Sequence, residues 1–327
     1  MNVVSQLVVR FAVLAAGVML AGAAVAQDFP SRPITVIVPF PPGGVTDPVA
    51  RLVGQRISDS VGQPVVVDNR PGGAGVIGAM VVKQARPDGY TIFFGHFATH
   101  TVNPFLYSKL PYDAVKDFAP ITPIVSSKHL LVVPAASPAK SVTELVALAK
   151  SKPEGLTFAS QGIGAGGHLL GEMLKVKTGA NLQHVAYKGS APAIQDILAG
   201  RVDLFFDALI TSGPHVREGR LRALAIASPV RAPLFPDVPT MAEAGFPGIE
   251  GDAWFGMFAP AGTPQPVVQK LHAEFLKAMS NPDVVKTLTS QGLDIFTLRT
   301  PDEFVQLIAA DTAKYGKVVR DAGVKVD

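Results

Sequence analysis

The chain has 327 residues, 48% of them hydrophobic, which is enough for one large domain or two domains with buried cores. Its 29 basic residues are dispersed and nearly balanced by 26 acidic ones, which argues against a nucleic-acid-binding stripe and against a polybasic membrane patch. The chain contains no cysteine, so disulfides and thiol chemistry are excluded.

The first 26 residues predict a secretory signal peptide. They carry one charge, Arg10, followed by an apolar run that ends in the small-residue pattern Ala24-Val25-Ala26. This run of about 16 residues is shorter than the roughly 20 that span a bilayer, so an uncleaved anchor is the less favoured alternative. We expect residues 1–26 to be removed on export and the mature chain to act outside the cytoplasm.

Short apolar runs alternate with helical patterns along most of the remaining chain. Strands are predicted at residues 35–38, 65–67, 91–94, 130–133, 157–159, 184–186, 204–206, 224–227 and 254–258. Helices are predicted at residues 47–61, 76–85, 141–150, 168–177, 191–199, 214–219, 266–279, 282–291 and 301–322. Short apolar strands between helices are typical of parallel strands buried on both faces, so the predicted class is α/β.

Two segments are interpreted as crossings between two lobes. They are residues 123–138 and the proline-rich residues 228–248, the second of which is alternatively a long surface loop. We expect lobe 1 to contain residues 27–127 and 250–327, and lobe 2 to contain residues 128–249. Each lobe is expected to be a mainly parallel sheet flanked by helices, with a cleft between the lobes.

Glycine-rich loops follow several predicted strands at their carboxyl ends, where open α/β sheets bind ligands. In the loop after the first strand, two prolines and two glycines precede a helix that Thr46 or Asp47 can cap. The loops are "PPGGVTD", "NRPGGAG", "GHFATH", "SQGIGAGGH" and "YKGSAP". Such loops expose backbone N–H groups, and helix N-termini add partial positive charge. The sequence therefore predicts a site for a small anion that needs little arginine.

Two motifs for cofactors are incomplete. Two G-x-G-x-x-G matches, Gly73–Gly78 and Gly162–Gly167, lack the acidic residue that holds a ribose, so no nicotinamide cofactor is expected. His96 and His100 have the spacing of zinc ligands, but Phe97 stands where the motif has glutamate. We expect hydrogen-bonded loop histidines there and no metal.

Two residues are candidates for catalytic groups. Ser160 follows a strand but lacks the G-x-S-x-G elbow of hydrolases. Asp207, at the end of a strand, either pairs with an amino or hydroxyl group of a ligand or caps the following turn. The alternative function is thus an exported carboxylate hydrolase or isomerase that uses Asp207 and His100.

Eight stretches together resemble one known family. In chain order they are "PFPPGGVTDPVAR", "GQPVVVDNRPGGAG", "PDGYT", "NPFLYSKLPYDAVKDFAP", "GGHLLGEMLK", "YKGSAPAIQDILAGRVDLFFD", "REGRLRALAIAS" and "DVPTMAEAGFPG". They resemble the solute-binding receptors of tripartite tricarboxylate transporters, the Bug or TctC family. The resemblance implies a type II periplasmic binding protein, a monomer without enzymatic activity. It would close on a mono-, di- or tricarboxylate or an acidic amino acid and deliver it to a membrane permease.

The resemblance also implies which residues contact the ligand, mostly through backbone amides, small hydroxyls and ordered waters. Carried over to this sequence, they are Phe40, Gly43, Gly44, Thr46, Asp47, Ala98, Thr99, Ser160, Gly164, Gly189 and Asp207. His96 and Phe97 stand where relatives often have small residues, which predicts a narrowed or reshaped pocket.

Overall fold

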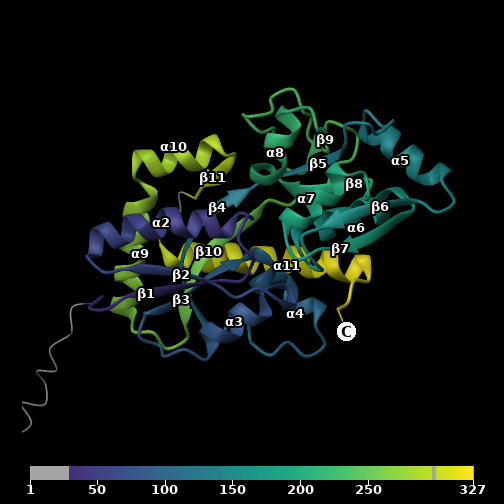
Figure 1. Ribbon diagram of the computed structural model, residues 1–327. Coiled ribbons are helices and arrows are strands. Elements are labelled where there is room, and N and C mark those ends of the chain that lie inside the picture. Colours follow the sequence, from purple (N-terminus) through teal and green to yellow (C-terminus); the bar gives the residue numbers. More distant parts are fainter. Residues whose placement is uncertain (1–28, 297–299, 327) are drawn as a thin grey trace, which may run out of the picture. The chain divides into compact units, whose positions relative to one another are not determined.

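Two mixed β-sheets flanked by helices account for the described part of the chain (Figure 1). The computed structural model describes residues 29–296 and 300–326, so the predicted signal segment lies outside the described residues. Residues 32–327 form one unit, to which the following description applies. The α/β class predicted from the sequence is confirmed.

The first sheet has the strand order β11-β4-β10-β3-β1-β2. Its strands are β1 (Ile34–Val38), β2 (Val65–Asn69), β3 (Thr91–His96), β4 (Phe118–Ser127), β10 (Ala253–Pro260) and β11 (Leu293–Ile295). Strand β1 pairs in parallel with β2 and β3, while β10 pairs antiparallel with β3 and β4.

The second sheet has the order β7-β6-β8-β5-β9. Its strands are β5 (His129–Pro134), β6 (Leu156–Ser160), β7 (Leu182–Ala186), β8 (Leu204–Ala208) and β9 (Leu221–Ile226). Strand β6 is parallel to β7 and β8, and β5 is antiparallel to β8 and β9. Most strands of each sheet run in one direction, as predicted. Both sheets are nevertheless mixed, because β10 and β11 in the first sheet and β5 in the second run against the other strands.

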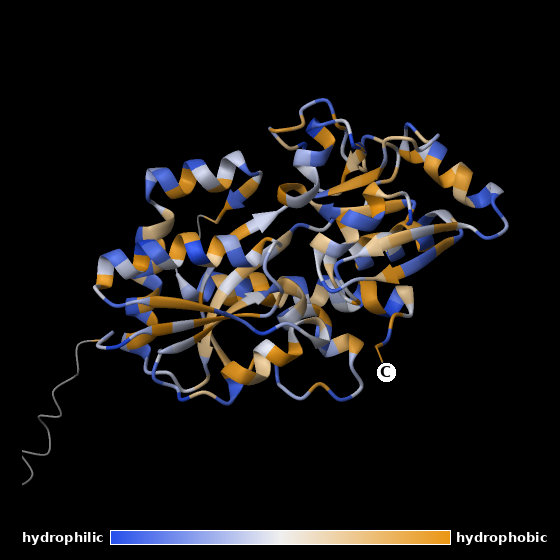
Figure 2. Ribbon diagram, in the orientation of Figure 1, coloured by the Kyte–Doolittle hydropathy of each residue, from blue (hydrophilic) through white to orange (hydrophobic). Residues whose placement is uncertain are grey.

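The helices cover both faces of the sheets. They are α2 (Thr46–Val61), α3 (Val76–Lys83), α4 (Asn103–Leu106), α5 (Val142–Ser151), α6 (Gly166–Thr178), α7 (Ser190–Leu198), α8 (Leu209–Arg217), α9 (Gln265–Met279), α10 (Pro282–Ser290) and α11 (Pro301–Ala322), with short turns η1 (Gly73–Gly75) and η2 (Ala98–Val102). Figure 1 shows α2 and α9 on one side of the first sheet and α3 on the other. Figure 2 shows hydrophobic residues along the strands and mixed polarity around α2.

The second sheet is buried on both faces because neighbouring residues of a strand point to opposite sides. Leu131 and Phe206 pack with residues of α5 and α6, whereas Leu130 and Phe205 pack with residues of α7 and α8. This explains why the strands read as continuous apolar runs in the sequence.

The chain passes between the sheets at the two predicted segments. Between β4 and β5 only Lys128 intervenes, so residues 123–138 are mostly strand rather than connector. Residues 228–248 contain no named helix or strand, but Met241 is part of the core of the second sheet. The assignment of the chain to two lobes at the boundaries given above stays a prediction. Among the described residues, no helix is both long and apolar enough to cross a membrane.

Candidate functional site

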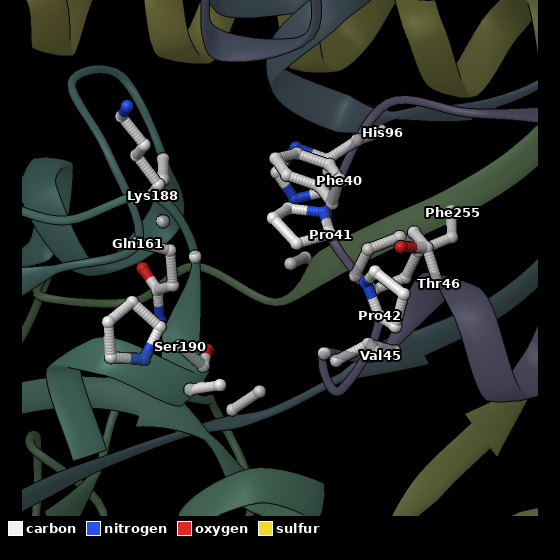
Figure 3. A pocket seen from close by; sticks show the side chains of 18 of the residues that line it. Phe40, Pro41, Pro42, Val45, Thr46, His96, Gln161, Lys188, Ser190 and Phe255 are labelled. Atoms are coloured by element: carbon white, nitrogen blue, oxygen red, sulfur yellow. The ribbon is translucent and has the colours of Figure 1, made fainter. Parts of the chain in front are cut away.

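One pocket is lined by loops and strand ends of both sheets (Figure 3). Its lining residues are Phe40, Pro41, Pro42, Gly44, Val45, Thr46, His96, His129, Gln161, Ala165, Gly166, Lys188, Gly189, Ser190, Ala191, Pro192, Ala208, Ala253 and Phe255. The space between them measures about 640 Å³, including the part that opens to solvent. Of the residues predicted to contact a ligand, four line this pocket: Phe40, Gly44, Thr46 and Gly189.

The pocket has two walls of different chemistry. We call Phe40, Pro41, Pro42, His96 and Phe255 the aromatic wall. It comes from the loop after β1, from the end of β3 and from β10. Figure 3 shows Phe40 and His96 close together on one side of the pocket.

We call Gln161, Lys188, Gly189 and Ser190 the polar wall. These residues follow β6 and β7, and Ser190 begins α7. In Figure 3, Gln161, Lys188 and Ser190 face the aromatic wall across the pocket. Lys188 is exposed and is the one cationic side chain, apart from histidines, among the described lining residues.

Four helices begin at the pocket without a side-chain cap. The N-cap residues of α2, α6, α7 and α8 are Val45, Ala165, Gly189 and Ala208, all of which line the pocket. In contrast, Ser141, Asn281 and Thr300 cap α5, α10 and α11 with their side chains. A missing cap alone is not diagnostic, since α9 also lacks one. Four at one pocket, however, bring several partially positive helix ends to its lining. A first-turn N–H is already used in α6, where Gly167 donates to Gln161 Oε1, and in α8, where Leu209 donates to the carbonyl oxygen of Lys128. A carboxylate can therefore take the place of a cap mainly at α2 and α7.

Thr46, in the first turn of α2, adds an unused polar group to the pocket lining. The side-chain Oγ1 is buried and has no hydrogen-bond partner, and the residue is 1% exposed. Buried hydroxyls are normally hydrogen-bonded, so an unpartnered one in a pocket lining fits a bound ligand or water.

Asp47 does not line the pocket but supports the loop after β1. Its carboxyl group accepts from Arg51, at 2.9 Å from Nη2. Arg51 also donates to Asn69, whose Nδ2 donates to the carbonyl oxygen of Phe40 at 3.0 Å. Asp47 thus connects α2, β2 and the aromatic wall.

His96 is held in the aromatic wall by two residues that the resemblance placed on the ligand. Thr99 Oγ1 donates to the carbonyl oxygen of His96 at 2.6 Å, and the Ala98 N–H donates to His96 Nδ1 at 3.4 Å. Neither Ala98 nor Thr99 lines the pocket. Burial, together with His129 and His100 nearby, lowers the pKa of His96 to about 3. The ring is therefore neutral at physiological pH. Phe97 contacts Tyr315 instead of the pocket.

Asp207 lies behind the polar wall, fully buried. One carboxyl oxygen accepts from Gln161 Nε2 at 3.0 Å and from Ser190 Oγ at 2.7 Å. The other accepts from Thr211 Oγ1 and Ser212 Oγ, both at 2.5 Å. Because these donors occupy both oxygens, Asp207 positions Gln161 and Ser190. The donors are all side chains, so Asp207 does not cap a backbone N–H of α8, although Thr211 and Ser212 lie in the first turns of that helix.

Three further predicted residues lie outside the pocket lining. Ser160 Oγ is 2.6 Å from His184 Nε2 and donates to the carbonyl oxygen of Gly162. Gly164 donates its N–H to His168 Nδ1 at 3.0 Å. Gly43 has a φ of 94° and lines a neighbouring groove beside α7 and α8. Their contact with a ligand stays a prediction.

The pair proposed for an enzyme is not assembled. His100 stacks on Phe258 with ring centroids 3.7 Å apart, in the core of the first sheet. No hydrogen bond joins it to Asp207, which belongs to β8 of the second sheet. Within residues 29–296 and 300–326, no cluster of three or more His, Asp or Glu side chains could hold a metal ion.

Sequence reasoning missed several lining residues, among them His129, Gln161, Lys188, Ser190 and Phe255. Gln161, Lys188 and Ser190 lie within the glycine-rich loops that the sequence pattern indicates, and their place within four residues of the end of a strand is a usable signal. Phe255 carries no such signal, because β10 returns to the first sheet after the chain has built the second. His129 at the start of β5 is likewise placed by the crossing alone.

A pocket lined by the ends of two sheets and by four helix N-termini indicates a ligand-binding protein. Residues 49–324 match the family described as "Tripartite tricarboxylate transporter family receptor". The chain is 42% identical over 292 residues to the "UPF0065 protein in tcbD-tcbE intergenic region" of Pseudomonas sp. (strain P51), covering 89% of this chain and 86% of that protein. The chain therefore belongs to the tripartite tricarboxylate transporter receptor (TctC, or Bug) family.

Solved structures of similar proteins agree with this assignment. R. palustris Rpa4515 with adipate has a TM-score of 0.87 at 36% identity, covering 91% of this chain and 99% of that chain. MatC (Rpa3494) from Rhodopseudomonas palustris with bound malate has a TM-score of 0.85 at 36% identity, and the match covers 89% of this chain and 100% of that chain. The periplasmic binding protein BugD has a TM-score of 0.86 at 34% identity, covering 91% and 99%.

Proposed function

We propose that this protein is a periplasmic receptor that captures a small carboxylate in the pocket between its two sheets and delivers it to a tripartite tricarboxylate-type permease. The observation that carries the proposal is the convergence of four helix N-termini without side-chain caps at one pocket. Two similar proteins have structures with adipate and with malate, which supports a carboxylate as ligand.

The proposed contacts are the first turns of α2 and α7, with the Thr46 hydroxyl and the backbone of Gly189. Uncharged donors can bind an anion strongly in a water-poor pocket, because hydrogen bonds to an ionised acceptor are roughly twice as strong as neutral ones. Asp207, Ala98 and Thr99 act on the ligand indirectly, through Gln161, Ser190 and His96.

Calorimetric titration with a panel of carboxylates and their uncharged amides tests the proposal. At least one acid should bind while its amide does not, and about 100 times its Kd should add about 2.7 kcal/mol of stability. Binding of an acid and its amide with equal affinity, or no binding by any acid, would contradict anion recognition at the helix ends.

The same samples test whether the protein is an enzyme. We propose that it has no enzymatic activity, because Asp207 and His100 lie apart and the family consists of receptors. NMR spectra of each carboxylate should remain unchanged after prolonged incubation with the protein. Protein-dependent formation of a product would instead favour a hydrolase or isomerase.

The proposal also covers the location, the transport partner and the oligomeric state of the protein. The exported protein should begin after Ala26 by mass spectrometry and elute as a monomer in light-scattering chromatography. The proposed lobes, residues 27–127 with 250–327 and residues 128–249, should close on the ligand by a hinge motion, which would reduce the radius of gyration in solution scattering. Uptake of the bound carboxylate by cells should require both this protein and a permease.

A further inference from the structure

The aromatic wall offers a ligand rings rather than hydrogen-bond donors. The His96 ring lies edge-on to Phe40, with centroids 5.5 Å apart, and 4.9 Å from the ring of Phe255. Pro41 and Pro42 extend the same surface with apolar C–H groups. Phe255 is 5% and His96 is 6% exposed, so both rings are fixed by their surroundings.

The charge of the pocket is suited to one carboxylate rather than two. Lys188 is the single Lys or Arg among the described lining residues, and no Asp or Glu lines the pocket. His96 is neutral, and burial also lowers the pKa of His129, whose Nδ1 lies 2.8 Å from the carbonyl oxygen of Gly251. A second carboxylate pressed against the aromatic wall would therefore be desolvated without a cation, which is costly.

We infer that the ligand is an aromatic monocarboxylate, with its ring against Phe40, His96 and Phe255 and its carboxylate at the first turns of α2 and α7. The inference rests on the proposed function, and it narrows the ligand from carboxylates in general to one class. Aromatic pairs gain energy beyond the area that they bury, because ring edges and faces carry opposite partial charges. A planar ring is therefore preferred over a saturated ring of the same size.

Calorimetric titration of the purified protein with four acids tests this inference. Benzoate is the probe, cyclohexanecarboxylate is its saturated analogue, and adipate and malate are dicarboxylates. Benzoate should bind about 3- to 10-fold more tightly than cyclohexanecarboxylate, the gain expected from aromatic contacts. It should bind at least 10-fold more tightly than either dicarboxylate.

The outcomes separate this inference from the proposed function. If adipate or malate binds most tightly, the inference that the ligand is an aromatic monocarboxylate is wrong, whereas the proposal that the protein binds a carboxylate still holds. If cyclohexanecarboxylate binds as tightly as benzoate, the aromatic wall acts only as an apolar surface and the inference also fails. If none of these acids nor any other carboxylate binds, the proposed function itself fails.

Substitution of the wall identifies the residues responsible. Phe255→Leu keeps an apolar side chain and should reduce the preference for benzoate over cyclohexanecarboxylate to less than twofold. Phe304→Leu is the matched control, because this buried ring packs on Trp254 and Phe258 and does not line the pocket. Phe40→Leu, in a half-buried loop position, provides the same test if Phe255→Leu does not fold. An unchanged preference in both wall variants would overturn the inference.

Discussion

The two walls of the pocket are constructed in different ways. The aromatic wall consists of side chains that pack on other rings. The ring centroids of Phe255 and Phe94 lie 6.2 Å apart, and those of His96 and Phe97 lie 4.3 Å apart. The polar wall consists of helix ends and of side chains held by one buried acid, Asp207. Substitution of one ring in the aromatic wall should thus be enough to change which ligand is preferred. The parts of the polar wall, in contrast, depend on each other, because one acid holds several of them.

The difference predicts that the largest loss of stability follows from removing Asp207. Asp207→Ala leaves the hydroxyls of Ser190 and Ser212 without an acceptor and removes one of two acceptors from Gln161 and Thr211, so it should lower the free energy of unfolding by about 3–5 kcal/mol. Urea unfolding measures this loss. Asp237→Ala, at an exposed position of the same region, should stay within about 0.5 kcal/mol of wild type. A loss below about 1 kcal/mol for Asp207→Ala would mean that the polar wall does not depend on this acid.

The aromatic wall should respond to pH through His96. Its pKa is lowered to about 3 in the folded protein and is about 6.5 in the unfolded chain, so acid favours the unfolded chain between these values. Stability is retained above pH 6.5 and is lost as the pH falls towards 3. For His96→Phe, the slope of unfolding free energy against pH should be shallower by about 1.4 kcal/mol per pH unit between pH 5.5 and 4.

The pH experiment has a control within the same wall. Urea unfolding at several pH values should give Phe255→Leu the same slope as wild type, because neither side chain titrates. Buried His100 and His168, whose pKa values are also lowered to about 3, should keep most of the acid sensitivity in every variant. If His96→Phe has the same slope of unfolding free energy against pH as wild type, the pKa of His96 is the same in the folded and the unfolded chain.

The sequence indicated Gly189 of the polar wall and Phe40 and His96 of the aromatic wall, but it missed Phe255, for a physical reason. Helix ends and glycine loops are local features, so the stretch "YKGSAP" alone indicates Gly189 and the start of α7. Phe255 reaches the pocket through pairing of β10 with β3, a contact between residues about 160 positions apart in the chain. Local patterns carry no information about such a contact.

Strand β4 was also hidden from local reasoning. Part of it was assigned to a crossing over residues 123–138, and it contains two prolines, Pro120 and Pro123, which cannot donate to a ladder. The structure accommodates them with two register shifts against β10, between Phe255 and Gly256 and between Met257 and Phe258, opposite these prolines. β-Bulges of this kind allow proline inside a sheet.

A smaller effect separates two serines near the polar wall. Ser160→Ala should lower the free energy of unfolding by about 1 kcal/mol, since Ser160 Oγ bonds only to protein groups. Its carboxylate affinity should stay within about twofold of wild type. Ser190→Ala removes the hydrogen bond from its pocket-lining hydroxyl to buried Asp207, which holds the first turn of α7 at the pocket, and should weaken affinity about 5- to 10-fold. Calorimetry measures the carboxylate affinity of both variants, and urea unfolding measures their stability. Equal affinities of the two variants would mean that the ligand does not depend on Ser190.

The smallest effect is expected at Lys188, on the exposed edge of the polar wall. Lys188→Gln should weaken carboxylate binding only about 2- to 5-fold, because exposed ion pairs contribute about 0.2–1 kcal/mol. Raising the salt concentration from 50 to 500 mM should reduce wild-type affinity and affect the variant less, since screening acts on the charge that it lacks. Lys150→Gln, on α5, is the control and should match wild type at both concentrations. A loss of 100-fold or more at Lys188 would mean that a single cation, and not the helix ends, holds the carboxylate.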